Sequence, residues 1–213
     1  MTYGINLTEK VKKMSHNQFD TYLAMRYGNP SMEKVLGEMR LKNYDQIIIF
    51  PLYPQYASAT TGSISEKAFK IISKWWVIPE IKIMGQFYDD YRYLECVKSR
   101  TLEFDLQSYD QILFSYHGIP ERHVDKVYLD GKPCKDHDCD TEINDSNKHC
   151  YKATCFATTR HLAKILNLKE DQHRTTFQSR LGRDPWLTPY TDKTVEKLGK
   201  DGMKKILVGN FFL

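Results

Sequence analysis

Four of the five cysteines in this 213-residue chain fall within one short segment. They are Cys134, Cys139, Cys150 and Cys155, in the pattern C-x4-C-x10-C-x4-C. Thiols that cluster in a protein of a reducing compartment favour metal binding over disulfide formation. Four thiolates satisfy either a [2Fe-2S] cluster or a structural zinc ion. Both metals stay open from the spacing, because it is not the C-x2-C of common zinc modules, and His137 or His149 could replace a thiolate.

His117 is the residue best suited to proton transfer or metal binding. It lies in the segment Phe-Ser-Tyr-His-Gly-Ile-Pro, directly after a predicted strand. A neutral imidazole accepts a proton or binds a borderline metal ion, and its pKa of about 6.5 lets it do either near neutrality. Gly118, the next residue, would allow the close approach of a flat ligand. A histidine judged alone is more often a half-buried loop residue, so the surrounding motif must decide.

The elements that must position these residues alternate between short strands and longer helices. We expect strands at residues 45–50, 80–84, 111–114, 174–177 and 205–208, and helices at 17–25, 32–42, 65–75, 89–103, 151–166 and 192–200. Such alternation predicts an α/β fold whose parallel sheets are flanked by helices. We expect two lobes, residues 1–106 and 107–213, with a cysteine-rich insert at 130–155. Cys96 falls in an apolar helical setting and is expected to be buried.

Three long loops rich in polar and aromatic residues follow predicted strands. They begin at Pro51, Ser115 and Gln178, and they carry Tyr53, His117 and Trp186, respectively. Ligands of open parallel sheets bind beyond the carboxyl ends of the strands, so the loops predict one shared cleft. Trp186 could lie against a flat ligand there or pack in the core.

These loops resemble the signatures of the ferrochelatase family. The similar segments are residues 51–63, 114–123 and 177–191, with a shorter one at 25–30. They occur in the family's order and at similar separations, and they cover nearly the whole chain. The resemblance implies two Rossmann-like, chelatase-type lobes. It also implies insertion of ferrous iron into a porphyrin, protoporphyrin IX or coproporphyrin III, in heme biosynthesis.

The resemblance also implies roles for individual residues. His117 would be catalytic and would handle either the ferrous iron, which is a substrate, or the pyrrole protons. The residues implied to contact the porphyrin are Arg26, Tyr27, Tyr53, Tyr88 and Trp186. Arg26 could pair with a propionate through two hydrogen bonds. Some ferrochelatases carry a cluster on the cysteines of an internal insert, which favours [2Fe-2S] over zinc at the four thiols.

Two departures from the family pattern bear on activity. The chain begins after the family's usual first strand and its glycine-containing turn, and it stops before the segment that bears an essential glutamate. We therefore expect an incomplete second lobe, and the sequence leaves open whether this chain alone is an inactive fragment. The alternatives are a non-catalytic porphyrin or iron–sulfur binding protein, and another tetrapyrrole chelatase that inserts cobalt or nickel.

Composition excludes some partner classes and leaves others open. The net charge of +4 is spread along the chain without a basic run, so no nucleic-acid partner is expected. No apolar run approaches the roughly 20 residues that span a bilayer, and the start does not resemble a signal peptide. We expect a cytoplasmic protein; peripheral membrane contact stays open, and the sequence does not predict the oligomeric state.

Overall fold

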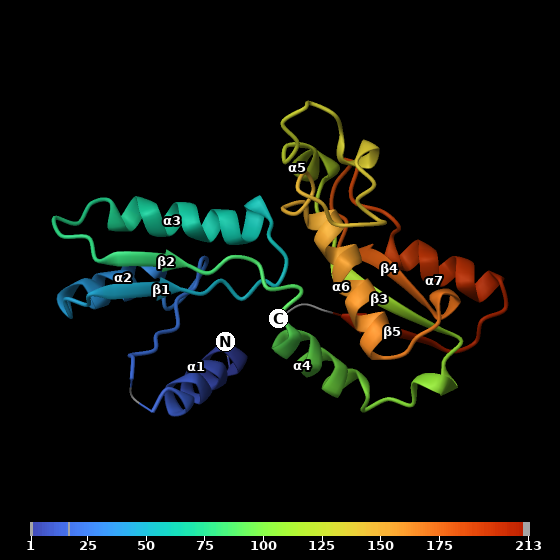
Figure 1. Cartoon of the computed structure of the whole chain (residues 1–213), viewed down its shortest axis with the longest axis horizontal. Helices are drawn as coiled ribbons and strands as arrows, with labels where there is room; N and C mark the ends of the chain where they lie inside the picture. The colour runs from blue at the N-terminus through green and yellow to red at the C-terminus, as the bar shows by residue number, and fades with distance from the viewer. Residues whose placement is uncertain (1, 17, 211–213) are drawn as a thin grey trace. The chain divides into compact units, whose positions relative to one another are not determined.

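The computed structural model describes residues 2–16 and 18–210 (Figure 1). The contacts within the chain divide it into two compact units: unit 1 is residues 1–51 and 61–84, and unit 2 is residues 52–60 and 85–213. This division differs from the sequence-based boundary at residue 106, because helix α4 (Tyr91–Thr101) packs against helix α6 (Tyr151–Ile165) in unit 2. The lobes at 1–106 and 107–213 stay a prediction.

Unit 1 is built on a two-stranded parallel sheet. Strand β1 (Gln46–Ile49) pairs along its length with β2 (Glu80–Ile83). Helices α2 (Met32–Leu41) and α3 (Ser63–Ile72) pack against each other. Their apolar faces close a core with the sheet, made of Met32, Leu36, Ile47, Ala68, Ile72 and Trp75.

The first helix of unit 1 covers a different sequence range from the one predicted. Helix α1 covers Thr2–Met14, whereas residues 18–24 of the expected helix at 17–25 form bends and extended chain. Asn17 lies outside the described residues. The residues around Asp20, Thr21 and Tyr22 have low helix propensity, and a helix this short needs tertiary packing to form. The prediction of a helix there was wrong.

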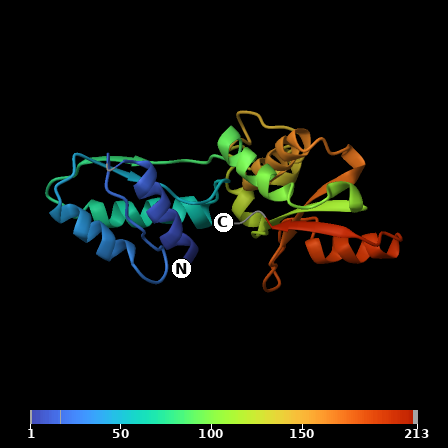
Figure 2. The ribbon, with the colours of Figure 1, turned by 90° about the horizontal axis from the view of Figure 1, so that it is seen from below.

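Unit 2 contains a three-stranded parallel sheet of order β4-β3-β5. The strands are β3 (Gln111–His117), β4 (His173–Gln178) and β5 (Ile206–Asn210). Every residue of β3 except His117 is buried, as expected for the central strand of a sheet covered on both faces. Helices α6 and α7 (Thr191–Lys200) flank the sheet on opposite faces (Figure 2).

Hydroxyl contacts join each flanking helix to its face of the sheet. Thr159 of α6 contacts the hydroxyls of Tyr116 and Thr175 at 3.1 and 2.9 Å. Thr191 of α7 contacts those of Ser115 and Thr176, both at 2.9 Å. The remaining elements are short: helix α5 (Glu121–Asp125), a π-helical turn at Ser58–Gly62, and 3-10 turns at Leu106–Ser108, Cys134–Asp136 and Glu170–Gln172.

The observed architecture confirms the predicted fold class, with parallel sheets flanked by helices. All five predicted strands are present, and β3 runs to His117 rather than stopping at Phe114. Cys96 of α4 is exposed, so the prediction that it is buried was wrong. Its side of α4 faces solvent, and the neighbouring Glu95 and Lys98 make this stretch more polar than the prediction assumed. No helix within residues 2–16 and 18–210 has the length and apolar character needed to cross a membrane.

Candidate active site and thiol trio

His117 is the last residue of β3, and its main chain is held from two sides. It pairs with Gln178 of β4 in the parallel register. The Tyr151 hydroxyl donates a hydrogen bond of 2.9 Å to the His117 carbonyl oxygen. The Gly118 amide donates one of 2.8 Å to the Gln178 carbonyl oxygen. The backbone that carries the imidazole is therefore fixed at the carboxyl edge of the sheet, where ligands of parallel sheets bind.

The electrostatic setting of His117 favours the neutral imidazole. The side chain reaches solvent, but the atoms packed around it remove part of its hydration, and this desolvation lowers the pKa of His117. Near neutral pH the ring is therefore largely unprotonated. A neutral ring can accept a proton or bind a metal ion.

The Trp186 loop lies directly beside the His117 loop. Pro120 and Trp186 form an antiparallel bridge. On either side of that bridge the Leu187 amide donates to the Ile119 carbonyl at 3.1 Å, and the Glu121 amide donates to the Pro185 carbonyl at 3.0 Å. The structure thus brings together two of the three loops that the sequence placed at one edge. The cleft between them stays a prediction.

Gly118 is required by the protein's own packing. A Cβ at this position would lie 2.9 Å from the Gln178 carbonyl oxygen and 3.3 Å from Cε3 of Trp186. The sequence assigned this glycine to the approach of a flat ligand, whereas the space beside it is filled by β4 and the Trp186 ring. Trp186 itself is partly buried, and its indole nitrogen has no hydrogen-bond partner among the described residues.

Tyr53 and Tyr88 differ in how far their side chains are exposed to solvent. Tyr53 is 38% exposed, in a loop fixed by a 2.9 Å hydrogen bond from the Gln55 amide to the Thr158 hydroxyl of α6. Tyr88 is only 6% exposed, and burial raises the pKa of its phenol. The ring of Tyr88 packs in the core, and its contact with a porphyrin stays a prediction.

Arg26 and Tyr27 belong to unit 1. The Arg26 Nε donates to the Ser63 side chain at 2.8 Å and to the Ser63 carbonyl at 3.2 Å, which joins the 25–30 segment to the 51–63 segment. The Arg26 guanidinium lies 4.6 Å from the centre of the Tyr27 ring, a cation–π distance. Tyr27 is 74% exposed, so its ring is open to a ligand.

Cys134, Cys139 and Cys150, here called the thiol trio, converge in unit 2. Their sulfur atoms are 3.4, 3.5 and 3.7 Å apart, and their residues are at most 3% exposed. Thiolates at two corners of a tetrahedron around an ion at ~2.3 Å lie roughly 3.8 Å apart. The trio therefore offers three preformed corners for a soft metal ion.

Cys155 does not join the trio, contrary to the expectation of four clustered thiols. It lies inside α6, fully buried, one turn after Tyr151, and desolvation raises the pKa of its thiol. The helix carries its side chain into the core rather than toward the insert. His137 and His149 are also outside the group of ligand atoms: the His137 ring stacks on Tyr128 at 3.7 Å, and the His149 ring meets Tyr56 edge to face.

Hydrogen bonds within the trio make one thiol acidic. Hydrogen bonds with Cys134 and Cys139 lower the pKa of Cys150, whereas hydrogen bonds with Cys139 and Cys150 raise the pKa of Cys134. The Tyr128 hydroxyl lies 2.7 Å from the Cys139 sulfur and adds a further polar contact. A thiolate is the form that binds metals, and the lowered pKa of Cys150 favours that form at this one thiol.

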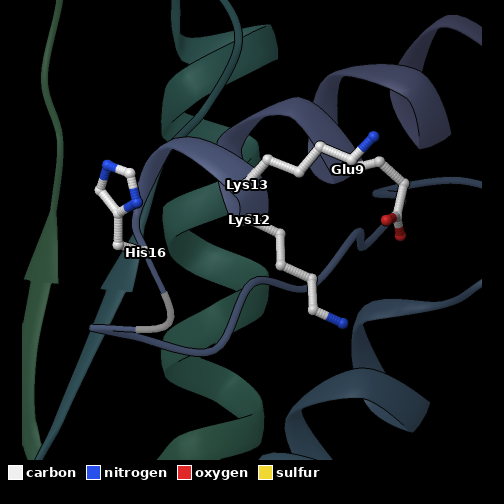
Figure 3. A pocket seen from close by; sticks show the side chains of 4 residues that line it. All are labelled: Glu9, Lys12, Lys13 and His16. Atoms are coloured by element: carbon white, nitrogen blue, oxygen red, sulfur yellow. The ribbon is translucent and has the colours of Figure 1, made fainter.

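A pocket beside α1 is unrelated to these sites. It is lined by Glu9, Lys12, Lys13 and His16, all of them exposed (Figure 3). It contains none of the side chains that the sequence predicts for catalysis, porphyrin binding or metal binding.

Comparison with known proteins decides the family. The family model Ferrochelatase matches residues 2–210. The chain belongs to the ferrochelatase family. A ferrochelatase of Legionella pneumophila (strain Corby) is 40% identical over 206 residues, 95% of this chain and 60% of the relative. One of Coxiella burnetii (strain Dugway 5J108-111) is 38% identical over 210 residues, 98% of this chain and 58% of the relative. The chain thus spans about three fifths of the length of the curated relatives that it matches.

In this member of the ferrochelatase family, sequence reasoning missed three residues that shape the sites. Tyr128 contacts the trio, Asn147 is fully buried and ties the insert by donating to the Glu142 carbonyl at 3.0 Å, and Tyr151 binds the His117 main chain. One signal was available, because Tyr151 directly follows Cys150 at the start of a predicted helix. The other two lie in irregular chain, where no periodic pattern indicates burial.

Proposed function

We propose that this protein inserts ferrous iron into a porphyrin, protoporphyrin IX or coproporphyrin III, as a step of heme biosynthesis. The observation that carries the proposal is the position of His117. It presents a neutral imidazole at the carboxyl edge of a buried parallel sheet, on a main chain held by Tyr151 and Gln178. The family membership and the names of the relatives support the same reaction.

Metal insertion removes water from the iron and two protons from the pyrrole nitrogens. In our proposal His117 accepts a pyrrole proton or binds the entering iron, and a neutral ring is needed for both roles. Trp186, beside the His117 loop, and the exposed Tyr53 would contact the macrocycle. Arg26 would pair with a propionate and Tyr27 would stack on the ring, which their cation–π pair and the exposure of Tyr27 support.

The test is an anaerobic assay of the longest natural form of the protein with ferrous iron and either porphyrin. We expect the absorption spectrum of the iron porphyrin to appear. His117→Ala should slow its appearance by about 100-fold or more, the scale of a lost acid–base group. His161→Ala, an exposed histidine of α6, is the matched control and should keep the rate. Equal rates for the unaltered protein and His117→Ala would remove His117 from the mechanism.

The same assay separates the other functions. Porphyrin binding without any metalloporphyrin would indicate a non-catalytic binding protein. Insertion that is faster with cobalt or nickel than with iron would indicate another tetrapyrrole chelatase. Either result would overturn the proposed reaction while keeping the family.

We also propose that the thiol trio binds a soft metal. The resemblance implies a [2Fe-2S] cluster, which needs four protein ligands; the trio supplies three, and Cys155 is not with them. The nearly equal sulfur separations are those around a single tetrahedral ion, which supports zinc with one further ligand as the second candidate. A reducing compartment such as the cytoplasm would keep these free thiols available.

Analysis of protein purified without oxygen distinguishes the two metals. Visible charge-transfer absorption with equal amounts of iron and acid-labile sulfide would establish the cluster. Stoichiometric zinc without visible absorption would establish the single ion. Protein that holds neither metal after expression with both supplied would refute metal binding at the trio.

A further inference from the structure

Tyr151 connects the start of α6 to the strand end that carries His117. It is the first residue of the helix, directly after Cys150 at the N-cap. Its side chain is largely withdrawn from solvent, with 7% of the residue exposed. From this position its hydroxyl donates a 2.9 Å hydrogen bond to the His117 carbonyl oxygen. The buried Tyr151 phenol thus forms a hydrogen bond with the main chain of His117, the proposed catalytic residue.

The peptide group between His117 and Gly118 is held at both of its polar atoms. Tyr151 binds its carbonyl oxygen, and the Gln178 carbonyl accepts its amide hydrogen at 2.8 Å. Gly118 has no room for even a Cβ between Gln178 and Trp186, so the backbone cannot shift toward them. Rotation of this peptide would break both hydrogen bonds. Because this peptide is bonded to the His117 Cα, the two hydrogen bonds also limit how far that Cα can shift.

We propose that Tyr151 is a positioning residue, whose hydroxyl holds the His117 carbonyl and thereby limits displacement of the Cα that carries the His117 imidazole. The inference rests on the proposed iron insertion, for which the position of the imidazole matters. A misplacement of a reacting group by about 1 Å costs on the order of 100-fold in rate. Loss of one of two restraints on the peptide should cost about 10-fold or more on that scale.

Tyr116 provides a matched comparison for Tyr151. It precedes His117 in β3, is fully buried, and its hydroxyl contacts Thr159 at 3.1 Å. Tyr116→Phe and Tyr151→Phe therefore delete the same atom from two buried phenols near the same strand end. A purely structural tyrosine predicts similar effects for both variants. A positioning tyrosine predicts a difference confined to Tyr151→Phe.

The first measurement is a kinetic assay of iron insertion. It uses the longest natural form of the protein with metal supplied to the thiol trio. We expect Tyr151→Phe to lower kcat for iron insertion by about 10-fold or more while KM for the porphyrin changes by less than about twofold, because the hydroxyl acts on the imidazole and not on porphyrin binding. Tyr116→Phe should keep kcat within about twofold once corrected for the folded fraction. Equal kcat values for the two variants, or a loss in Tyr151→Phe confined to KM, would overturn the proposal.

The second measurement does not require turnover. Nuclear magnetic resonance of the unaltered protein and both variants reports the His117 ring and the Gly118 amide. We expect the His117 ring signals and the Gly118 amide signal to move in Tyr151→Phe and to stay in place in Tyr116→Phe. Unmoved signals in Tyr151→Phe would refute positioning. If the unaltered protein inserts no iron, the proposed reaction fails while this comparison still decides the role of Tyr151.

Discussion

At the scale of single residues, the environment of His117 predicts how the rate of iron insertion depends on pH. Desolvation lowers the pKa of His117 below its ordinary 6.5, so the neutral ring persists to lower pH than in a free histidine. We expect kcat/KM for iron insertion to be constant near pH 7 and to fall only as the pH drops below about 6.5. A pH–rate profile of the unaltered protein measures this limb. A midpoint above pH 7 would contradict the role of a desolvated imidazole.

The same desolvation also makes the free energy of unfolding depend on pH. A histidine whose pKa is lowered by folding binds protons more readily in the unfolded chain, so its contribution to stability is lost as the pH falls below about 6.5. His173 of β4 also has its pKa lowered by burial. The two histidines act in the same direction. Acid should therefore begin to weaken unit 2 as the pH falls below about 6.5.

An added methyl group at Gly118 should lower the free energy of unfolding. Gly118→Ala forces a Cβ to 2.9 Å from the Gln178 carbonyl, and overpacking of this kind costs about 1–3 kcal/mol. Gly37→Ala in α2 is the control, since a Cβ there meets nothing within 4 Å; a helix-interior alanine should stabilise by up to about 1 kcal/mol. Urea unfolding measures both. Equal stability of Gly118→Ala and the unaltered protein would show that β4 and Trp186 can move aside.

At the scale of elements, the insert around the thiol trio is the part that should depend most on metal. The chain between α5 and α6 has no regular structure except the short 3-10 turn at Cys134–Asp136, and its buried residues are Tyr128, the trio and Asn147. Metal binding to such a segment is coupled to its folding. Removing the metal with a chelator should therefore open residues 126–149 to proteolysis and leave the β3–β4–β5 sheet protected.

The trio also predicts which cysteines matter for that metal. Cys134→Ser should abolish stoichiometric metal binding, because it removes one of three converging thiols. Cys155→Ala should retain the metal, since this thiol lies within α6 and apart from the group. Elemental analysis of the two variants measures the contrast. Loss of metal in Cys155→Ala would restore the four-thiol set that the sequence indicated.

The elements also show which parts of the fold and of the site could be predicted from the sequence. Strands were predictable because each contains a short run rich in β-forming residues, and all five are present. The sequence predicted a helix at 17–25 that the structure lacks at residues 18–24 and did not predict α1 at Thr2–Met14, since tertiary packing decides such short segments. The spacing of Cys155 suggested a ligand, but α6 begins at Tyr151 and carries this thiol into the core. The position of His117 could be predicted from its motif, whereas its tie to Tyr151 depends on how α6 packs.

At the scale of the whole molecule, each unit has its own core, and adjacent tryptophans test the core of unit 1. Trp75 is 8% exposed within that core, whereas Trp76 is 94% exposed. Trp75→Ala should lower the free energy of unfolding by about 3–5 kcal/mol. Trp76→Ala should change it by less than about 0.5 kcal/mol. Denaturant unfolding followed by circular dichroism compares the two, and equal effects would contradict the assignment of Trp75 to the core.

The central place of β3 has a consequence for synthesis on the ribosome. β1 and β2 are complete once residue 83 has emerged, whereas β3 gains β4 only after α6 and gains β5 only after α7. Until residue 210 has left the exit tunnel, the apolar β3 lacks a neighbour on one edge, and unpaired apolar strands of this kind invite aggregation and chaperone binding. Of the strands within residues 2–16 and 18–210, the one that carries His117 therefore gains its second neighbour only when β5 is made.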